Sequence, residues 1–385
     1  MVKKKNIQNN SNSVFVETVT GLKDALKVLR RETVIGVDLE ADSMFHFKEK
    51  VCLIQIATLD TIFIIDPLAV KDLSPLQALF ADKGIKKVFH GADYDVRSLY
   101  RDFRICIENL FDTELACRFL GLEQTSLEKV ILKYFDETLD KKYQKKDWSQ
   151  RPIPKQMAEY AAKDAFYLIP LAEILEKQLK EKNRLAWVIE ECELLSRVRP
   201  SENPSFPLYM NFKGAGKLKP ENLAILEDLL IFRMQLAQQY DKPLFKVIGN
   251  RSLMILANKK PADLKELENS KALSARQITR YGVDILKIIQ EALNKSENEL
   301  PEYPRGKAIR YRASVAKRIK ALKTWKEEKA NMLKIDPSLV LTKLQMIAIA
   351  NTNPFDMETL DSVDRLKKWQ TSEFGQGIIA ALNKG

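Results

Sequence analysis

The 385-residue sequence is poor in the two side chains that most often build transition-metal and disulfide sites, with two histidines and four cysteines. No two of the cysteines have the close spacing of a zinc-binding pair. They are scattered among apolar residues, which predicts reduced thiols in the interior of an intracellular protein. The four are Cys52, Cys106, Cys117 and Cys192.

Long apolar runs are missing as well, since no stretch reaches the ~18 apolar residues that a membrane-spanning helix requires. The basic residues 1–6 are followed by a polar segment, whereas a secretory signal would continue with apolar residues. The motif Gly-x-x-x-x-Gly-Lys-Ser/Thr is also absent, which argues against ATP-driven unwinding and a nucleotide cofactor. We therefore expect a soluble, cytoplasmic, monomeric protein that does not act at membranes.

The remaining composition is that of a folded, basic protein. Apolar residues make up 45% of the chain, which excludes a mainly disordered protein, and the net charge is +11. Such a charge suits a polyanionic partner, either nucleic acid or an anionic membrane surface, although it can also serve solubility alone. The length allows two or three domains.

The first half of the chain alternates short β-rich runs with helical patterns. Two β-rich runs, 51–58 and 61–65, are separated by two residues, so we expect adjacent antiparallel strands. The order predicts an α/β layered domain. Strands are expected at 14–16, 34–39, 51–58, 61–65 and 87–89, and helices at 22–29 and through most of the segment up to residue 195.

The second half is helical and contains an internal repeat. Proline and glycine are concentrated between residues 199 and 220, and a second break lies at 296–304. The sequence around Asn258 recurs around Asn351, an offset of 93 residues (351 minus 258), and in each copy an Asp is placed to cap the next helix. This predicts two copies of one small helical module with a binding or architectural role.

The first chemical motif is an apolar strand, residues 34–40, that ends in Asp-x-Glu. Residues two apart in a strand face the same side, so Asp38 and Glu40 project together. Two neighbouring carboxylates repel each other unless a cation lies between them. The motif by itself fits either a divalent-metal site or a strand end that meets solvent.

The second motif is a short strand, 87–89, that runs through His90 and a glycine-containing turn into a helix. Asp95 lies in the first turns of that helix, where it is either a functional carboxylate or an ordinary N-terminal charge. His90 is either a ligand or a structural histidine at a strand end.

The third motif is the helical sequence 157–168. Tyr160 and Asp164 stand four residues apart and share one helix face. The small residues Ala161, Ala162 and Ala165 would let this helix lie close to a sheet. Taken alone, the pattern favours an amphipathic helix with a buried tyrosine and a solvated aspartate.

In this order the three motifs resemble the DEDD superfamily of 3′→5′ exonucleases, in the subgroup with tyrosine in the third motif. The sequences at 51–57 and 147–152 agree, and the strongest likeness is to the ribonuclease D family. The repeated tail resembles HRDC domains, which are small helical nucleic-acid modules.

The resemblance implies a ribonuclease H-like exonuclease domain, a mixed sheet flanked by helices, followed by two small all-α HRDC domains. We expect the exonuclease domain at 1–205 and the HRDC domains at 214–295 and 305–385. The linkers are then 206–213 and 296–304.

The resemblance also implies two-metal hydrolysis of RNA 3′ ends, releasing nucleoside 5′-monophosphates. Asp38 would serve both ions, Glu40 and Asp164 the ion that activates water, and Asp95 the second ion. Carboxylate oxygens favour Mg²⁺ or Mn²⁺ over zinc.

Tyr160 would orient the attacking water by its hydroxyl group. With an unperturbed pKa near 10 it is not expected to be a strong general base. A histidine takes this role in a sister subgroup, but His46 and His90 both precede the third motif.

Basic and aromatic residues before the third motif are candidate contacts to a single strand, whose phosphates bind cations and whose bases stack. Phe45 and Phe47, after the first motif, would either contact terminal bases or pack in the core. The basic stretch 305–329 is either an RNA-binding surface or an exposed cationic helix. The candidate contacts are His90, Tyr143, Lys145, Lys146, Trp148 and Arg151.

Three functions fit these residues. The first is an exoribonuclease that trims tRNA precursors or other small structured RNAs. The second is a 3′→5′ DNA exonuclease, and the third is a nucleic-acid binding protein without activity. The complete carboxylate set argues against the third, and only the family resemblance favours RNA over DNA.

Overall fold

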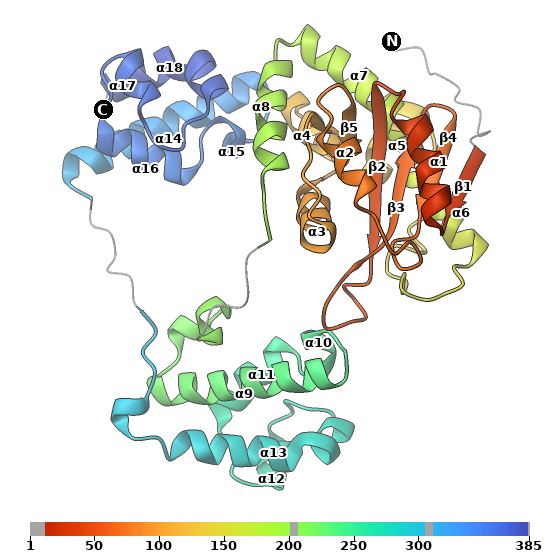
Figure 1. The fold of residues 1–385 in the computed structure, drawn as a ribbon. Coiled ribbons are helices and arrows are strands. Elements are labelled where there is room, and N and C mark those ends of the chain that lie inside the picture. Colours follow the sequence, from red (N-terminus) through yellow and green to blue (C-terminus); the bar gives the residue numbers. More distant parts are fainter. Residues whose placement is uncertain (1–11, 201–206, 305–310, 384–385) are drawn as a thin grey trace. The chain divides into compact units, whose positions relative to one another are not determined.

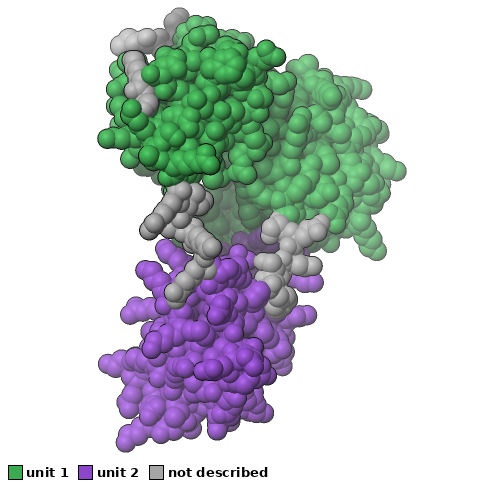
Figure 2. All heavy atoms as spheres, turned by 90° about the vertical axis from the view of Figure 1, so that its left-hand side faces the viewer, with its two compact units in different colours: residues 1–41, 51–200, 310–385 green, residues 42–50, 201–309 purple. Residues whose placement is uncertain are grey.

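The computed structural model describes residues 12–200, 207–304 and 311–383, which belong to two compact units (Figures 1 and 2). Unit 1 comprises residues 1–41, 51–200 and 310–385, and unit 2 comprises residues 42–50 and 201–309. Within the described ranges no helix is long and apolar enough to cross a membrane.

A six-stranded mixed sheet forms the centre of unit 1, in the order β1-β4-β3-β2-β5-β6. Strands β2 and β4 both run antiparallel to β3, as predicted for the β3–β4 pair, and the other neighbours are parallel. Strand β6 was not predicted, because three residues are too few to show an alternation. The strands are β1 (Asn12–Val16), β2 (Val34–Ala41), β3 (Val51–Ala57), β4 (Thr61–Ile65), β5 (Lys86–Phe89) and β6 (Leu110–Asp112).

Eight helices complete the part of unit 1 that we call the nuclease domain. Helix α6 packs across β2, β3 and β4, and α7 continues over β2 and β5. Strand β3 is buried along its whole length, as expected for the central layer of a sheet covered by helices. The helices are α1 (Val19–Leu29), α2 (Pro75–Ala81), α3 (Asp93–Phe103), α4 (Thr113–Leu120), α5 (Leu127–Phe135), α6 (Lys155–Phe166), α7 (Leu168–Glu181) and α8 (Leu185–Ser196).

The first helical module, in unit 2, consists of five helices. Asp263 caps α12 by accepting a hydrogen bond from the Glu266 amide at 2.7 Å, as the repeat predicted. The helices are α9 (Pro220–Gln239), α10 (Leu244–Val247), α11 (Asn250–Lys259), α12 (Leu264–Asn269) and α13 (Ala275–Leu293).

The second helical module repeats this order in unit 1, and each of its helices begins 93 residues after its counterpart, for example 313 against 220. Asp356 caps α17 through the Thr359 amide at 2.8 Å, so this capping residue is also confirmed. The helices are α14 (Ala313–Leu333), α15 (Pro337–Val340), α16 (Lys343–Thr352), α17 (Met357–Asp361) and α18 (Lys368–Asn383).

The second module docks on α4 and α8 of the nuclease domain. Trp187 of α8 stacks on Trp369 of α18 with ring centres 4.9 Å apart, and Phe119 meets the same ring edge-on at 5.5 Å. The buried Arg184 side chain donates to the carbonyl oxygens of Phe119 at 2.7 Å and Leu333 at 2.8 Å. This contact was not predicted, because it joins segments far apart in the sequence.

The predicted linker 206–213 largely packs into unit 2. Residues Leu208–Asn211 form a short 3₁₀ helix, and Tyr209 and Phe212 lie in the core of the first module. The amides of Leu208 and Tyr209 both donate to the Glu227 carboxylate at 2.8 Å. The boundaries given for the three domains stay a prediction. Residues 1–6 and the first part of the basic stretch, 305–310, lie outside the described residues.

Candidate active site

Strand β2 places Asp38 and Glu40 on the face of the sheet that α6 covers. Gly36 lies on the same face, and a Cβ atom there would be 3.1 Å from both the Ala165 carbonyl oxygen and the Leu168 Cβ. The glycine therefore lets the end of α6 approach the strand closely. The residues of β2 thus determine both the positions of the two carboxylates and the distance between the strand and α6.

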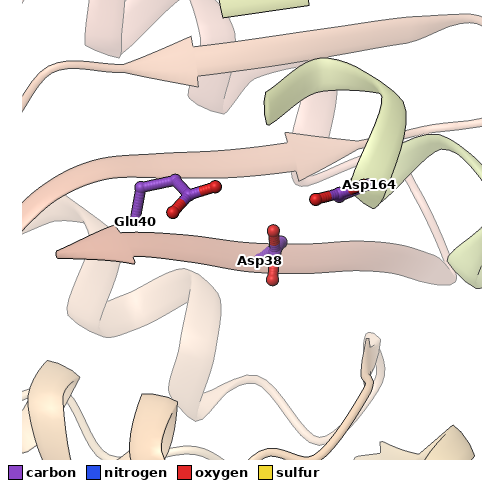
Figure 3. Close-up of side chains that lie close together, drawn as sticks. All are labelled: Asp38, Glu40 and Asp164. Carbon is purple, nitrogen blue, oxygen red and sulfur yellow. The ribbon is translucent and has the colours of Figure 1, made fainter. Parts of the chain in front are cut away.

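Helix α6 adds Asp164 to this pair. One carboxylate oxygen from each of Asp38, Glu40 and Asp164 lies within 4.8 Å of the others, and the three groups point toward one space (Figure 3). The buried Ala161 and Ala165 keep the helix near the sheet, as the sequence predicted. Such a spacing of hard oxygen ligands is suited to a divalent cation.

Asp95 lies in the first turn of α3, and its side chain is buried. It is outside the three-residue group, but its charge raises the pKa of Asp38 and of Glu40. Burial, followed by the charge of Asp112, raises the pKa of Asp95 to about 7.

Asp112 supports this arrangement and was missed by the sequence analysis. Its carboxylate accepts hydrogen bonds from Gly91 at 3.0 Å and Ala92 at 2.7 Å, in the turn that begins α3. It also caps α4 through Glu114 at 2.7 Å. The signal that could have revealed it is an aspartate between a short apolar run and a helical pattern.

The turn itself requires Gly91. Its φ is +75°, and a Cβ atom would lie 2.8 Å from a Glu114 carboxylate oxygen. Asp112 and Gly91 together fix the start of α3, and with it the position of Asp95 in the first turn of that helix.

The carboxyl groups of the site have raised pKa values, which a bound cation would lower. Burial, then the charges of Asp164 and Asp95, raise the pKa of Asp38 well above its ordinary value. Burial, then the charge of Asp38, does the same for Glu40. Burial raises the pKa of Asp164 to about 6, although the Tyr160 hydroxyl and Lys163 oppose this shift. A divalent cation would favour the ionised forms.

Tyr160 and Asp164 stand one helical turn apart on α6, and the Tyr160 hydroxyl opposes the rise that burial causes in the pKa of the Asp164 carboxyl. Burial, then the charges of Asp164 and Glu40, raise the pKa of this tyrosine well above its ordinary value of 10.0. The phenol therefore stays protonated near neutral pH and acts as a hydrogen-bonding group rather than as a base.

The carboxylates open into a cleft of about 420 Å³. Among the described residues that line it, Lys141 is the only lysine or arginine, and its Nζ is 2.5 Å from Glu128. The walls are therefore mainly acidic around the reactive groups. The lining includes Asp38, Glu40, His90, Glu114, Glu128, Asp140, Lys141, Gln144, Tyr160 and Asp164.

Residues 13–180 match the 3′-5′ exonuclease family, and residues 222–289 and 315–382 match the HRDC domain. The chain is 30% identical over 341 residues to Ribonuclease D of Desulfotalea psychrophila, covering 88% of this chain and 90% of that protein. The chain belongs to the ribonuclease D family.

Two further comparisons of this ribonuclease D family member, one of sequence and one of structure, give consistent results. Ribonuclease D of Bartonella henselae is 28% identical over 366 residues, with 94% of this chain and 88% of that protein covered. The crystal structure of Escherichia coli RNase D matches with a TM-score of 0.71 and 24% identity, covering 97% of this chain and 99% of that chain. The second likeness confirms the fold, a mixed sheet with flanking helices followed by helical HRDC modules.

Family membership makes the chain a hydrolase of the 3′→5′ exoribonuclease class. It also implies the use of divalent metal, for which the acidic cluster is present. The two HRDC matches fall on the two copies of the internal repeat, so that interpretation of the tail is confirmed.

His90 lines the cleft, as a contact to substrate requires. Its Nδ1 lies 2.8 Å from the Thr113 hydroxyl, which itself donates to the Phe89 carbonyl at 2.9 Å. The hydroxyl therefore accepts, and Nδ1 carries the imidazole hydrogen. Burial lowers the pKa of His90, which keeps the ring neutral. A substrate contact by His90 stays a prediction.

Two of the predicted nucleic-acid contacts, Trp148 and Arg151, have structural partners within the nuclease domain. Trp148 is 1% exposed and packs against Tyr160 with ring centres 6.1 Å apart, so it cannot stack on a base. Arg151 binds the buried Asp66 carboxylate through two hydrogen bonds of 2.6 and 2.7 Å and donates to the Cys52 carbonyl at 2.9 Å. The local sequence reveals neither the burial of Trp148 nor the pairing of Arg151 with Asp66. Contact of the Arg151 side chain, which is 26% exposed, with nucleic acid stays a prediction.

The other predicted contacts lie at the surface. Lys145 and Lys146 are exposed, and Tyr143 packs beside Tyr160 with ring centres 5.8 Å apart. The Tyr143 hydroxyl donates to Gln156 at 2.9 Å. Their contact with nucleic acid remains a prediction.

Phe45 and Phe47 pack within unit 2. Phe47 lies against the core of the first module, and Lys246 sits over the Phe45 ring at 4.1 Å. All four cysteines are free, but Cys106 is exposed rather than buried as predicted.

Proposed function

We propose that Asp38, Glu40, Asp95 and Asp164 hold two divalent ions, Mg²⁺ or Mn²⁺, and that this centre hydrolyses the last phosphodiester bond of an RNA 3′ end. The observation that carries the proposal is the group of three carboxylate oxygens within 4.8 Å of one another at the base of a cleft. The products would be nucleoside 5′-monophosphates.

The donor set fits these metals. Every ligand is a carboxylate, and carboxylate oxygens prefer Mg²⁺ and Mn²⁺ to softer ions. Asp38 would serve both ions, Glu40 and Asp164 one of them, and Asp95 the other. When bound, the ions would supply a nucleophile at neutral pH and neutralise charge on the leaving oxygen.

The protein groups have separate tasks in this proposal. Tyr160, one helical turn from Asp164, would direct the attacking water through its hydroxyl oxygen. His90 and Tyr143 would contact the terminal nucleotides, and Lys145 and Lys146 the phosphates that follow. Asp112 positions Asp95 by fixing the turn before α3.

We further propose that the substrates are structured RNAs with a free 3′ end, such as tRNA precursors. The Escherichia coli relative is described as an exoribonuclease involved in structured RNA processing. The net charge of +11 and the two HRDC modules support binding beyond the terminal nucleotide. A cytoplasmic location and a monomeric state stay predictions.

A degradation assay with matched RNA and DNA strands, each labelled at the 5′ end, tests this function. We expect the RNA to shorten from its 3′ end in Mg²⁺ or Mn²⁺, EDTA to stop the reaction, and Asp38→Asn to abolish it, by at least about 1,000-fold. Asp93→Asn is the matched control, because Asp93 is exposed and pairs with Arg97 at 2.8 Å. Preference for DNA, rescue by zinc alone, or a folded Asp38→Asn protein with wild-type rate would each contradict the proposal.

A further inference from the structure

Unit 2 contains a basic pocket of about 360 Å³, formed by the turn after α9, by α10 and by the first two turns of α13. Four of its lining residues are cations, and none is a carboxylate. The lining residues include Tyr240, Lys242, Lys246, Arg276, Gln277 and Arg280.

The positive charge of this basic pocket is not neutralised from within the described part of unit 2. None of Lys242, Lys246, Arg276 and Arg280 has a described carboxylate oxygen within 4.0 Å. Asp241, the adjacent acid in the sequence, is engaged by His46 Nδ1 at 2.7 Å and by the Phe47 amide at 3.0 Å.

Aromatic rings hold two of these cations in place. The Arg280 guanidinium lies 4.2 Å from the centre of the Tyr240 ring, and Lys246 Nζ lies 4.1 Å from the centre of the Phe45 ring. Contacts of this kind orient a cation without cancelling its charge. The basic pocket therefore presents fixed positive charge to a ligand.

The same place in the second module can be identified residue by residue. Gln277 donates to the Val247 carbonyl at 2.9 Å, and its counterpart Gln370 donates to the Val340 carbonyl at 2.9 Å. The amide before each helix donates to the same glutamine, at 3.0 Å from Ser274 and 3.2 Å from Lys367. Each pair is related by 93 residues, so the two faces correspond.

In the second module this face is already occupied by acidic groups. The Glu190 carboxylate accepts hydrogen bonds from the amides of Lys368 and Trp369, both at 2.8 Å. Glu191 accepts from the Trp369 indole at 3.0 Å and pairs with Lys367 at 2.5 Å. The fold therefore uses the start of its last helix to bind carboxylates of α8.

The first module keeps this face but changes its chemistry. Arg276 stands where the second module has Trp369, and Arg280 stands where it has Glu373. The stacking residue and the acid are thus both replaced by guanidinium groups, which bind phosphate oxygens in pairs of hydrogen bonds.

We propose that the basic pocket of the first module binds phosphate groups of the RNA backbone. This inference rests on the proposed function, because it takes RNA as the substrate. Arg276 and Arg280 supply the main contacts, and Lys242 and Lys246 extend the positive surface. The second module's corresponding face serves the nuclease domain, so the two copies of the repeat have different ligands.

Binding of a labelled RNA hairpin with a single-stranded 3′ tail tests the inference. The full-length chain would carry Asp38→Asn, and affinity would be measured over a range of salt concentrations. We expect Arg276→Ala with Arg280→Ala to weaken binding at least about tenfold and to lower the log–log salt slope by about one to two. Lys265→Ala with Lys287→Ala is the charge-matched control, because both lysines are exposed and lie outside the basic pocket.

Three outcomes separate the possibilities. Equal affinity and equal salt slope in the two double variants would overturn the basic pocket's role. Loss of binding to polyglutamate as large as the loss to RNA would assign the pocket to acidic protein segments instead. Hydrolysis of a trinucleotide RNA by the wild-type chain tests the proposed function separately, since its absence would remove the substrate on which the inference depends.

Discussion

The acidic centre depends on side chains that repel one another when no cation is bound. Asp38, Glu40 and Asp164 converge within 4.8 Å, and burial raises the pKa of each. The protein tolerates this arrangement because Gly36 and the alanines of α6 bring strand and helix together over an apolar layer. Repulsion among these carboxylates destabilises the folded chain, and a bound cation would remove that repulsion.

Asp95 contributes one component of the pH dependence of stability. Its pKa is raised from 3.8 to about 7 in the folded chain, so between these values the folded state binds more protons than the unfolded state. The stability that the protonated Asp95 side chain contributes is therefore fully present below about pH 4, and it is lost as the pH rises through about 7. We expect Asp95→Asn to stabilise the metal-free chain at pH 8 by up to about 4 kcal/mol relative to its effect at pH 4.

Thermal unfolding in EDTA at several pH values would measure this difference. Asp93→Asn is a suitable comparison, because the hydrogen bond from Arg97 lowers the pKa of Asp93, and its small contribution is lost as the pH falls. Added Mn²⁺ should stabilise the wild-type chain more at pH 8 than at pH 5. A pH-independent effect of Asp95→Asn would contradict the buried-carboxylate account.

Tyr160 offers a test of water positioning. Its pKa lies well above 10.0, so the phenol is protonated throughout the neutral range. We expect Tyr160→Phe to lower kcat by about 100-fold with little change in KM, because the hydroxyl that directs the nucleophile is gone. The ratio of the wild-type and variant rates should be constant from about pH 7 to about pH 9. A ratio that rises tenfold per pH unit would indicate a phenolate base instead.

Among the strands and helices, features set by local periodicity were predicted from the sequence, whereas features set by long-range packing were not. The alternation of β2 and the four-residue spacing in α6 are local, so they predicted which side chains share a face. The pairing of β6 with β5 and the hydrogen bonds of Asp112 to Gly91 and Ala92 join segments about 20 residues apart, and they were not predicted. Trp148 and Arg151 looked like RNA contacts only because their partners, Tyr160 and Asp66, are invisible in the local sequence.

Arg151 should therefore act on stability rather than on RNA affinity. Removing its side chain leaves the Asp66 carboxylate buried without its cation and frees the segment before α6. We expect Arg151→Ala to lower the free energy of unfolding by about 3–5 kcal/mol. Lys145→Ala with Lys146→Ala, which changes two exposed cations nearby, should leave stability unchanged. A stable Arg151→Ala protein with weakened RNA binding would restore the original interpretation.

At the scale of the whole molecule, the two copies of the repeat have different partners. The second module contributes Trp369 to an aromatic stack with Trp187 of the nuclease domain, and Glu190 caps its last helix. Close approach is built in at Gly121, whose φ is +82° and where a Cβ atom would lie 2.0 Å from the Lys334 carbonyl oxygen. The first module instead forms unit 2 with residues 42–50.

Deleting the two modules should therefore have different effects. A chain ending at residue 304 would expose Trp187 and Phe119, and we expect a loss of several degrees in Tm and binding of an apolar dye. A chain in which a Gly/Ser linker replaces residues 201–309 should lose less stability, because that stack remains. Thermal unfolding of both proteins makes the comparison, and equal losses would contradict the assignment of a structural role to the second module.

The stack of Trp187 on Trp369 also sets a condition on how this protein is made. The ribosome adds Trp369 long after α8 has emerged, and at about 5–20 residues per second the interval is on the order of ten seconds. During that time an aromatic face of the nuclease domain has no cover, and it stays uncovered in any polypeptide released early. Proteases and chaperones recognise such surfaces, so a chain with an intact acidic centre but an incomplete tail would be short-lived. We therefore expect Trp369 to link the survival of the nuclease to the completion of its synthesis.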